Sequence, residues 1–469
     1  MILKKSTDKF KEIFWLPAIF VHLILLVNTK FTLWPEMVVY PYLINRSFLL
    51  YRDIINPYPP IFIAFLSIFA KAFGYLPSPY QILTWTVIIV IDLSIFAVVS
   101  KISKNYYHAF FALAFFIILS VPFGINGLWF DLIQTPFVIF SIYYFYNYSK
   151  SQKAFELRKS FYLIILALFI KQQVLWLIIS YLTVLLVQNR NKIQSLTKNL
   201  LLPFTFFCFL FFVHVAFFYK QGTLNDFLFW AIYQPFIKGS SLPGYISFPT
   251  LKQLLILALP FLLIFNFTVF AKNKKFLITL LALPLIMFAY PRFDYFHLIT
   301  YLAIVAVSLG IHLGGLQLPS TKKLLLPLGL IILLSIFTIH YFKSNWHQPV
   351  RFFEQDILSV ASFLSQVTSQ NSVIYIQNGP DQLLPLSGRL PVKPWADEFP
   401  WYLERGDIEE RIVSAIRSQN PPFVIYKPYE NKGKYSLGSY RPADIADYLD
   451  ANYVNLIQIN DTLWLKVRK

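Results

Sequence analysis

Acidic and basic side chains stand beside long apolar runs at only a few points of this sequence. Glu36 follows the first apolar run and Asp131 opens a later one, whereas Lys171 interrupts a third. Arg292 and His297 lie in a short stretch between two further runs. A carboxylate can take the proton from a hydroxyl group, and cations can stabilise the charge of a departing phosphate. These residue types are therefore the ones needed to move a group from a phosphate carrier to a hydroxyl acceptor.

We assign these residues separate roles in such a reaction. Glu36 is the candidate general base, because partial desolvation at a membrane interface raises the pKa of a carboxylate into the range that suits a base. Asp131 either orients the acceptor or binds donor hydroxyls. Lys171, Arg292 and His297 are the candidate phosphate contacts, since a cation at membrane depth is costly unless an anion is nearby.

Each of these side chains also has a structural interpretation. Glu36 could be a solvated residue of a surface helix, and Asp131 could cap the N-terminus of its own helix. Lys171 could extend to the lipid headgroups. Arg292 could pair only with Asp294, which we count as a supporting residue.

The stretch after the first apolar run carries three further supporting candidates. Residues 36–50 have the spacing of an amphipathic helix along the membrane surface, with Glu36, Tyr40 and Ser47 on one face. Arg52 and Asp53 follow, either as a structural ion pair or as the cap of a helix end. Prolines then break the chain before the next apolar run.

These residues belong to a chain that is largely apolar. Hydrophobic residues make up 57% of its 469 residues and charged residues only 14%, whereas a soluble domain carries about 25% charged residues. Before residue 343 the apolar runs are long enough to cross a bilayer core of about 30 Å as helices. The composition predicts an α-helical polytopic membrane protein with about 11–13 membrane segments.

The net charge of +18 comes mainly from short basic loops, so it indicates topology rather than binding of nucleic acid. These loops are residues 101–104, 150–159, 190–198, 272–275 and 322–323. We expect the protein to lie in the inner membrane with these loops in the cytoplasm. The N-terminus then also lies in the cytoplasm. The candidate residues and the C-terminus then lie on the extracytoplasmic face. The single cysteine, Cys208, excludes an intrachain disulfide and a Cys-rich metal site.

Two segments do not fit a simple count of crossings. Residues 160–187 must leave and return between two basic loops, and Lys171 interrupts them, which predicts two short half-spanning helices. The chain between the first apolar run and the first basic loop needs an odd number of crossings, yet it contains two runs, 59–76 and 80–100. One of them must be re-entrant or split, and the sequence does not decide which. Asp92, inside the second, needs a partner that the sequence does not name.

The composition becomes mixed polar and apolar towards the C-terminus, which predicts the domains 1–342 and 343–469. The second is expected to be a small extracytoplasmic α/β domain. Its predicted helices are 350–368, 404–418 and 442–450, and its predicted strands are 373–376, 423–426, 454–459 and 463–467.

Two irregular stretches carry aromatic side chains. The stretch 380–400 could reach over the active site, contact the acceptor or only stabilise the domain. It carries Asp381, Arg389, Trp395 and Asp397, and Trp401 follows it. The outer loop 220–250 contains the aromatic residues Trp230, Tyr233 and Tyr245, which could stack on a sugar or cover a lipid tail. Alternatively, this loop only connects helices.

Four motifs together resemble a known family. The acidic residue after the first membrane helix, the Tyr-Arg-Asp-Ile stretch at 51–54 and the double proline at 59–60 resemble the multi-spanning GT-C glycosyltransferases. The resemblance is greatest to the family 39 group, with protein O-mannosyltransferases and the lipid A aminoarabinose transferase. Asp131 is similar to the second acidic position of that family, residues 168–172 to its apolar-Lys motif, and residues 290–297 to its late outer Arg/His segment.

The resemblance implies an enzyme of GT-C fold that moves a sugar from a polyprenyl-phosphate-linked donor to a protein, lipid or glycan acceptor on the outer face. Many members have a pair of carboxylates in the first outer loop, whereas Pro35 precedes the single Glu36 here. One carboxylate is a poor cage for a divalent ion, so a metal is not favoured and no other cofactor is expected.

Two other classes of function stay open. A transporter or flippase of lipid-linked sugars would usually have internal repeats and polar sites near the membrane midplane, and this sequence shows no repeat. A non-enzymatic envelope protein that presents the C-terminal domain would leave the outer acidic and basic residues unexplained. The expected partners are a polyprenyl-phosphate sugar donor, an acceptor and membrane lipids.

Overall fold

The chain divides into two compact units, each assembled from several stretches of sequence. The first comprises Met1–Phe31, Gln81–Phe211 and Phe248–Gln348, and the second Thr32–Tyr80, Phe212–Ser247 and Pro349–Lys469. The computed structural model describes residues 15–191, 193–238, 246–264, 276–313, 320–396, 400–403, 407–428 and 442–469. Several sequence predictions lie outside the described residues, namely those on 1–14, 239–245, 272–275, Asp397 and the side chain of Trp401.

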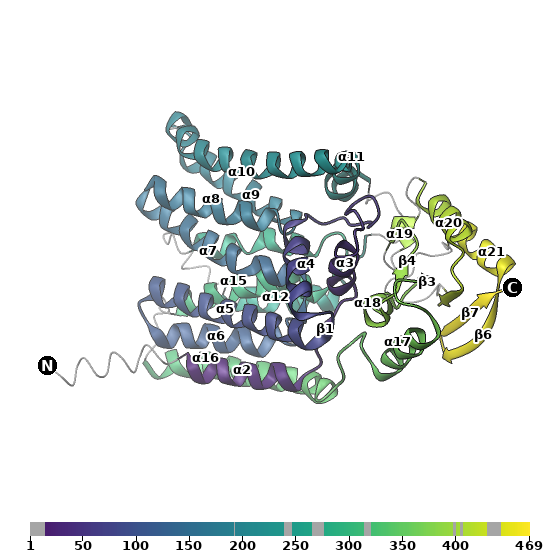
Figure 1. Ribbon diagram of the computed structural model, residues 1–469. Helices are drawn as coiled ribbons and strands as arrows, with labels where there is room; N and C mark the ends of the chain where they lie inside the picture. The colour runs from purple at the N-terminus through teal and green to yellow at the C-terminus, as the bar shows by residue number, and fades with distance from the viewer. Residues whose placement is uncertain are drawn as a thin grey trace. The chain divides into compact units, whose positions relative to one another are not determined.

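The first unit is a set of apolar helices that run alongside one another (Figure 1). Helices suit a lipid surrounding because they satisfy their own backbone hydrogen bonds. Two of the helices are divided between the units. The second unit contains the first residues of α5 and the last residues of α10. The elements are α2 (Leu16–Asn28), α5 (Pro77–Ser103), α6 (Tyr106–Ser120), β2 (Gly127–Leu128), α7 (Phe130–Ser151), α8 (Ala154–Leu168), η1 (Gln172–Val174), α9 (Leu175–Gln188), α10 (Ile193–Gln221), α12 (Leu251–Ile264), α14 (Phe276–Leu280), η4 (Leu283–Ala289), η5 (Tyr295–Leu298), α15 (Ile299–Leu313) and α16 (Ser320–Asn345).

Helix α15 forms the core of this unit, because all of its residues except His312 are buried. Helix α10 is the opposite case, with large apolar side chains such as Phe204 and Phe209 exposed. Such a surface is stable only in an apolar surrounding. Among the described helices, Pro77–Ser103, Ile193–Gln221 and Tyr295–Leu313 are long and apolar enough to cross a membrane.

The predicted interruption at Lys171 is confirmed. Helix α8 ends at Leu168, the backbone of Lys171 is extended with φ −150° and ψ 127°, and η1 begins at the next residue. The buried Asp92 of α5 also has a partner, because its Oδ2 lies 2.7 Å from Nδ1 of His22 in α2. His22 is therefore the partner that the sequence did not name.

The second unit contains the first outer loop, the segment 212–247 and the C-terminal α/β structure. Helix α4 belongs to it and has 13 residues, whereas the 27 residues of α5 lie mostly in the first unit. Ahead of the C-terminal sheet, the elements of the second unit are β1 (Thr32–Leu33), α3 (Glu36–Ile44), α4 (Ile61–Phe73), α11 (Leu224–Phe227) and the π-helix η2 (Leu228–Lys238).

The predicted amphipathic surface helix over 36–50 is wrong. Helix α3 ends at Ile44, and Ser47 is exposed in the turn that follows, with a φ of 64°. Every residue from Glu36 to Leu43 is buried. After Glu36 the helix is apolar or aromatic all round, and such a helix is stable when it is enclosed rather than laid on a surface.

A five-stranded sheet organises the C-terminal part of the second unit, in the order β4-β3-β5-β7-β6. Strands β4, β3 and β5 are parallel, whereas β7 is antiparallel to both β5 and β6. The strands are β3 (Val373–Gln377), β4 (Leu390–Pro391), β5 (Phe423–Tyr426), β6 (Tyr453–Asn460) and β7 (Leu463–Arg468). The helices are α17 (Gln355–Val367), α18 (Leu383–Ser387), α19 (Pro400–Leu403), α20 (Ile408–Gln419) and α21 (Ala443–Asn452).

This part follows the sequence prediction closely. The predicted α/β class and the four predicted strands are present, and the short apolar runs around Ile374 and Val424 are the buried central strands. Parallel strands are enclosed on both faces, so they read as continuous apolar runs. The predicted helices start up to five residues late.

Candidate active site

Three of the predicted site residues meet in the first unit. Oδ2 of Asp131 lies 2.5 Å from Nζ of Lys171 and 2.8 Å from Nδ1 of His297. The same Nδ1 lies 3.2 Å from Nζ of Lys171. The side chains of Asp131 and Lys171 are each about 1% exposed, and that of His297 is 14% exposed. The cluster is thus one buried carboxylate with two groups that can carry positive charge, of which the imidazole is the most accessible.

The proton on the imidazole has two alternative positions. If Nδ1 of His297 carries it, the ring donates to Asp131. If Nδ1 is bare, it accepts from the ammonium group of Lys171 instead. Both contacts use the same ring nitrogen, so His297 makes one of these two hydrogen bonds at a time.

Asp131 stands in the first turn of α7, where the N-terminus of the helix favours a negative charge. Its second carboxylate oxygen, Oδ1, accepts a hydrogen bond of 3.1 Å from Nε2 of Gln134. One turn further, the hydroxyl of Thr135 donates to the backbone carbonyl of Asp131 and lies 2.7 Å from the hydroxyl of Thr300 in α15. Asp131 is therefore fixed by its own helix and by α15.

Lys171 reaches the cluster because the chain leaves the helix there. Its backbone N–H still donates to the carbonyl of Ala167, 3.0 Å away, which anchors the residue to the end of α8. A lysine within a continuous helix would be held to the direction of that helix. Here the extended backbone before η1 lets the ammonium group meet Asp131.

His297 is held in place by a short turn and a close packing contact. Asp294 caps η5, since its Oδ1 accepts from the backbone N–H of Tyr295 at 2.7 Å. Phe296 directly precedes His297. Gly124 approaches it so closely that a Cβ added to the glycine would lie 3.1 Å from the Phe296 Cβ. The glycine also has a φ of +81°, which other residues rarely adopt.

The remaining phosphate candidate, Arg292, is half-buried between η4 and η5 in the first unit. The prediction that it contacts phosphate stays a prediction. Within the described part of the chain, no group of three or more His, Cys, Asp or Glu residues is arranged to hold a metal ion.

Glu36 and Tyr40 lie one turn apart on α3 in the second unit. Glu36 is only 5% exposed and Tyr40 is fully buried. The Tyr40 ring meets the ring of Trp395 edge to face, with centroids 5.6 Å apart. The sequence did not link the first outer loop to the C-terminal part, and this contact shows that the helix of Glu36 packs against it.

Arg52 and Asp53 do not pair with one another. The guanidinium group of Arg52 donates to the carbonyl of Gly222, and its Nε lies 3.4 Å from Asp226. The carboxylate of Asp53 lies 3.0 Å from Nζ of Lys393. Both residues therefore hold distant segments onto the first outer loop, and the expectation of a local ion pair between them is wrong.

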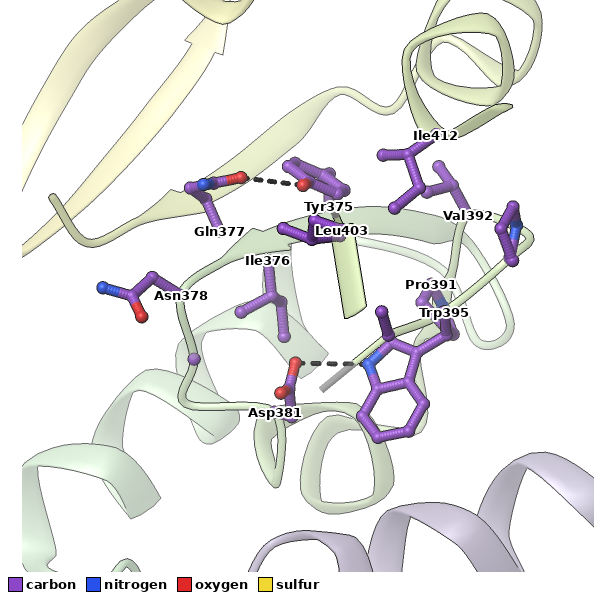
Figure 2. A pocket seen from close by; sticks show the side chains of 13 residues that line it. Tyr375, Ile376, Gln377, Asn378, Asp381, Pro391, Val392, Trp395, Leu403 and Ile412 are labelled. Carbon is purple, nitrogen blue, oxygen red and sulfur yellow. Dashed lines mark hydrogen bonds between the residues drawn. The ribbon is translucent and has the colours of Figure 1, made fainter. Parts of the chain in front are cut away.

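A pocket lies at the carboxyl ends of the parallel strands, next to Asp381 and Trp395 (Figure 2). The indole N–H of Trp395 donates to Oδ1 of Asp381 at 3.3 Å. In open α/β sheets, ligands bind at this edge, where the connections from neighbouring strands leave on opposite sides of the sheet. The residues that line the pocket are Tyr375, Ile376, Gln377, Asn378, Gly379, Asp381, Pro391, Val392, Pro394, Trp395, Ala396, Leu403 and Ile412.

Arg389 does not join this pocket. It is 3% exposed, and its guanidinium group donates to Thr368 and to the carbonyls of Leu364, Ser365 and Ser387. These acceptors lie at the end of α17 and beside α18. Of the two alternatives for Arg389, the structure supports stabilisation of the domain.

Comparison with known proteins identifies the fold without a sequence relative. No protein-family model matches the sequence, and no curated protein matches it. The structure is similar to the crystal structure of ArnT from Cupriavidus metallidurans bound to undecaprenyl phosphate, with a TM-score of 0.62, 11% identity and 98% of each chain covered. The fold is of the GT-C type. The Archaeoglobus fulgidus oligosaccharyltransferase tethered to an acceptor peptide is also similar, with a TM-score of 0.52, 12% identity, and 96% of this chain and 73% of that chain covered.

The chain is thus a polytopic membrane protein of GT-C fold with a small C-terminal sheet, as the sequence predicted. Sequence reasoning missed Gln134 as a partner of Asp131. The spacing of three residues along a helix was the available signal, because residues i and i+3 are neighbours on a helix surface.

Proposed function

We propose that this GT-C protein is a glycosyltransferase that moves a sugar from a polyprenyl-phosphate-linked donor to an acceptor on the extracytoplasmic face of the inner membrane. The cluster of Asp131, Lys171 and His297 carries the proposal. A buried lysine in a membrane protein marks a site where an anion has to be accommodated. In the cluster Asp131 serves as that anion.

A phosphate would engage the same two groups. Asp131 keeps Lys171 and His297 close together, so a donor phosphate that approaches the more accessible imidazole meets both at once. Arg292 adds a bidentate fork to this set. Asp131 then orients the two cationic groups instead of acting on the acceptor directly.

The transfer can be written in terms of these residues. Glu36 takes the proton of the acceptor hydroxyl while the acceptor oxygen forms a bond to the anomeric carbon of the sugar. The bond between that carbon and the phosphate oxygen breaks, and its electron pair stays on the polyprenyl phosphate. Lys171, Arg292 and His297 stabilise the additional negative charge on this leaving group.

The two similar structures support both ends of this reaction. One holds undecaprenyl phosphate, and the other is tethered to an acceptor peptide. A lipid-linked donor and a separate acceptor are therefore the partners that we propose. The acceptor could be a protein, a lipid or a glycan.

A topology follows from assigning the basic loops to the cytoplasm. We assign a membrane crossing to α5 and none to α4, because α4 is about half as long and belongs to the second unit. The stretch between α2 and the first basic loop then has the odd number of crossings that it needs. In this topology residues 343–469 form an extracytoplasmic domain and the N-terminus is cytoplasmic.

The test is a transfer assay with the full-length protein in proteoliposomes, using radiolabelled undecaprenyl-phosphate sugars and an extract of envelope acceptors. We expect labelled acceptor and free undecaprenyl phosphate. Lys171→Met should abolish both, whereas Lys220→Met, which changes an exposed lysine, should abolish neither. Movement of intact donor across the bilayer without cleavage would instead identify the protein as a flippase and refute the transferase.

A further inference from the structure

The π-helix η2 exposes an apolar face and buries a glutamine on its other side. Its outward residues are apolar or aromatic and exposed, namely Leu228, Ile232, Tyr233, Phe236 and Ile237. Its inward side begins with buried Trp230 and Ala231, and then reaches Gln234, which is completely buried. A helix with this pattern faces lipid on the outside and needs a polar partner on the inside.

Gln234 has no such partner within the described part of the chain. Its side chain is 0% exposed, and neither Oε1 nor Nε2 makes a hydrogen bond there. Buried polar groups are almost always hydrogen-bonded, because water that is removed has to be replaced. An apolar residue at this position would fit the buried side at no such cost. π-helical turns are rare and are frequently found at functional sites.

Aromatic contacts anchor the segment that carries Gln234. Trp230, four residues earlier, meets the ring of Tyr402 edge to face with centroids 6.0 Å apart. At the start of the segment, Tyr51 packs against Phe218 and Phe227, with ring centroids 5.1 and 5.3 Å away. The helix that carries the amide is therefore anchored in the second unit, and the completely buried amide is not a surface side chain.

A second polar group in the same segment is in a similar state. The hydroxyl of Thr223 is buried, and it makes no hydrogen bond to the residues that the structure describes. Arg52 fixes this end of the segment through Gly222 and Asp226. The segment 222–238 thus carries two buried polar side chains that nothing in the described protein uses.

We propose that the amide of Gln234 binds a pair of neighbouring hydroxyl groups on a sugar. An amide presents one acceptor and one donor side by side, which matches one hydroxyl that donates and one that accepts. The phosphodiester of a polyprenyl-phosphate sugar cannot satisfy the carbonyl oxygen because it has no hydroxyl group to donate, and a lipid tail satisfies neither atom. The inference rests on the proposed function and adds a residue that recognises the sugar itself.

The test compares Gln234→Met with wild type, both as full-length protein in detergent micelles. Methionine keeps the length of the side chain and removes both polar atoms. Because the amide lacks a partner in the free protein, the melting temperature should be unchanged or higher. A clear fall would show that the amide has a partner in the protein, and this would overturn the proposal. Gln221→Met, at an exposed glutamine of α10, is the matched control.

Binding then locates the sugar. Affinity for undecaprenyl phosphate alone should be the same in wild type and Gln234→Met. If the amide binds the donor sugar, affinity for undecaprenyl-phosphate hexoses and pentoses should fall about 10- to 100-fold in the variant, the value of two lost hydrogen bonds. If it binds a sugar of a glycan acceptor, donor affinity should stay and the KM for that acceptor should rise by a similar factor.

Two results separate this proposal from the proposed function. Equal sugar affinities and equal acceptor KM values in wild type and Gln234→Met would overturn the role of Gln234 while leaving the transferase intact. Absence of undecaprenyl-phosphate binding by wild type would refute the proposed function. In that case thermal shifts with free mono- and disaccharides still decide on Gln234, because only wild type should then be stabilised by them.

Discussion

Nζ of Lys171 lies 2.5 Å from Oδ2 of Asp131, and the two side chains are each about 1% exposed. Forty residues of sequence separate them, and each stands where its helix begins or is interrupted. The pair removes the cost of two isolated charges, yet it leaves the imidazole of His297 at its accessible side. A pair of this kind can be both structural and functional, and the two contributions can be separated by experiment.

We expect Asp131→Asn and Lys171→Met each to lower the free energy of unfolding by about 3–5 kcal/mol, because each leaves one buried charge without its partner. The double variant should recover much of this loss, since it removes both charges. Thermal unfolding in micelles measures the change. Sugar transfer should stay abolished in the double variant, and recovered activity would show that the pair is only structural.

Glu36→Gln should lower kcat for sugar transfer by about 10²- to 10⁴-fold, the usual contribution of a general base. The amide keeps the shape of the buried side chain, so donor affinity and melting temperature should change little. Glu410→Gln, at an exposed position of α20, is the control. Unchanged kcat in Glu36→Gln would remove Glu36 from the mechanism.

Arg389→Ala should destabilise the C-terminal part of the second unit by about 3–5 kcal/mol, because two carbonyl groups at the end of α17 lose a buried charged donor and each unsatisfied group costs about 1–3 kcal/mol. Arg389→Lys should recover only part of the loss, since an ammonium group cannot reproduce the planar fork. Hydrogen exchange of residues 364–390 measures the effect. Fast exchange confined to residues outside this stretch would contradict the assignment.

Burial raises the pKa of Glu409 above its ordinary value of 4.5. The folded protein then holds the proton to a higher pH than the unfolded chain does, so this carboxyl group reduces stability as the pH rises from 4.5 through the folded pKa. Glu409→Gln removes the effect and still accepts from the N–H of Ile445. We expect a rise in melting temperature on the order of 1 °C at pH 7 and none at pH 4, since the group is partly exposed.

The control for this titration is Glu410→Gln, next to it on the exposed side of α20. It should leave the dependence of melting temperature on pH as it is in wild type. A Glu409→Gln variant that is less stable than wild type at pH 7 would show that the charged carboxylate stabilises the fold, and would contradict the sign that we derive.

Much of the fold could be predicted because its signals are local. The length of the apolar runs, the polar interruption at Lys171 and the short apolar strands around Ile374 and Val424 all depend on neighbouring residues in the chain. The error at α3 has a physical reason as well. Residues 36–50 have a helical spacing, but burial on every side, not the spacing, decides that this helix is enclosed.

The sequence by itself determined that the chain enters a membrane, that it carries a C-terminal α/β part, and which side chains were chemically capable. It could not determine which of them meet. Contacts between residues far apart in the chain bring Asp131, Lys171 and His297 together. Such contacts also pair Arg52 and Asp53 with distant residues instead of with each other. They bury the amide of Gln234 as well. Such contacts follow from how helices pack, because packing decides which buried charge finds a partner and which polar group is left for a ligand.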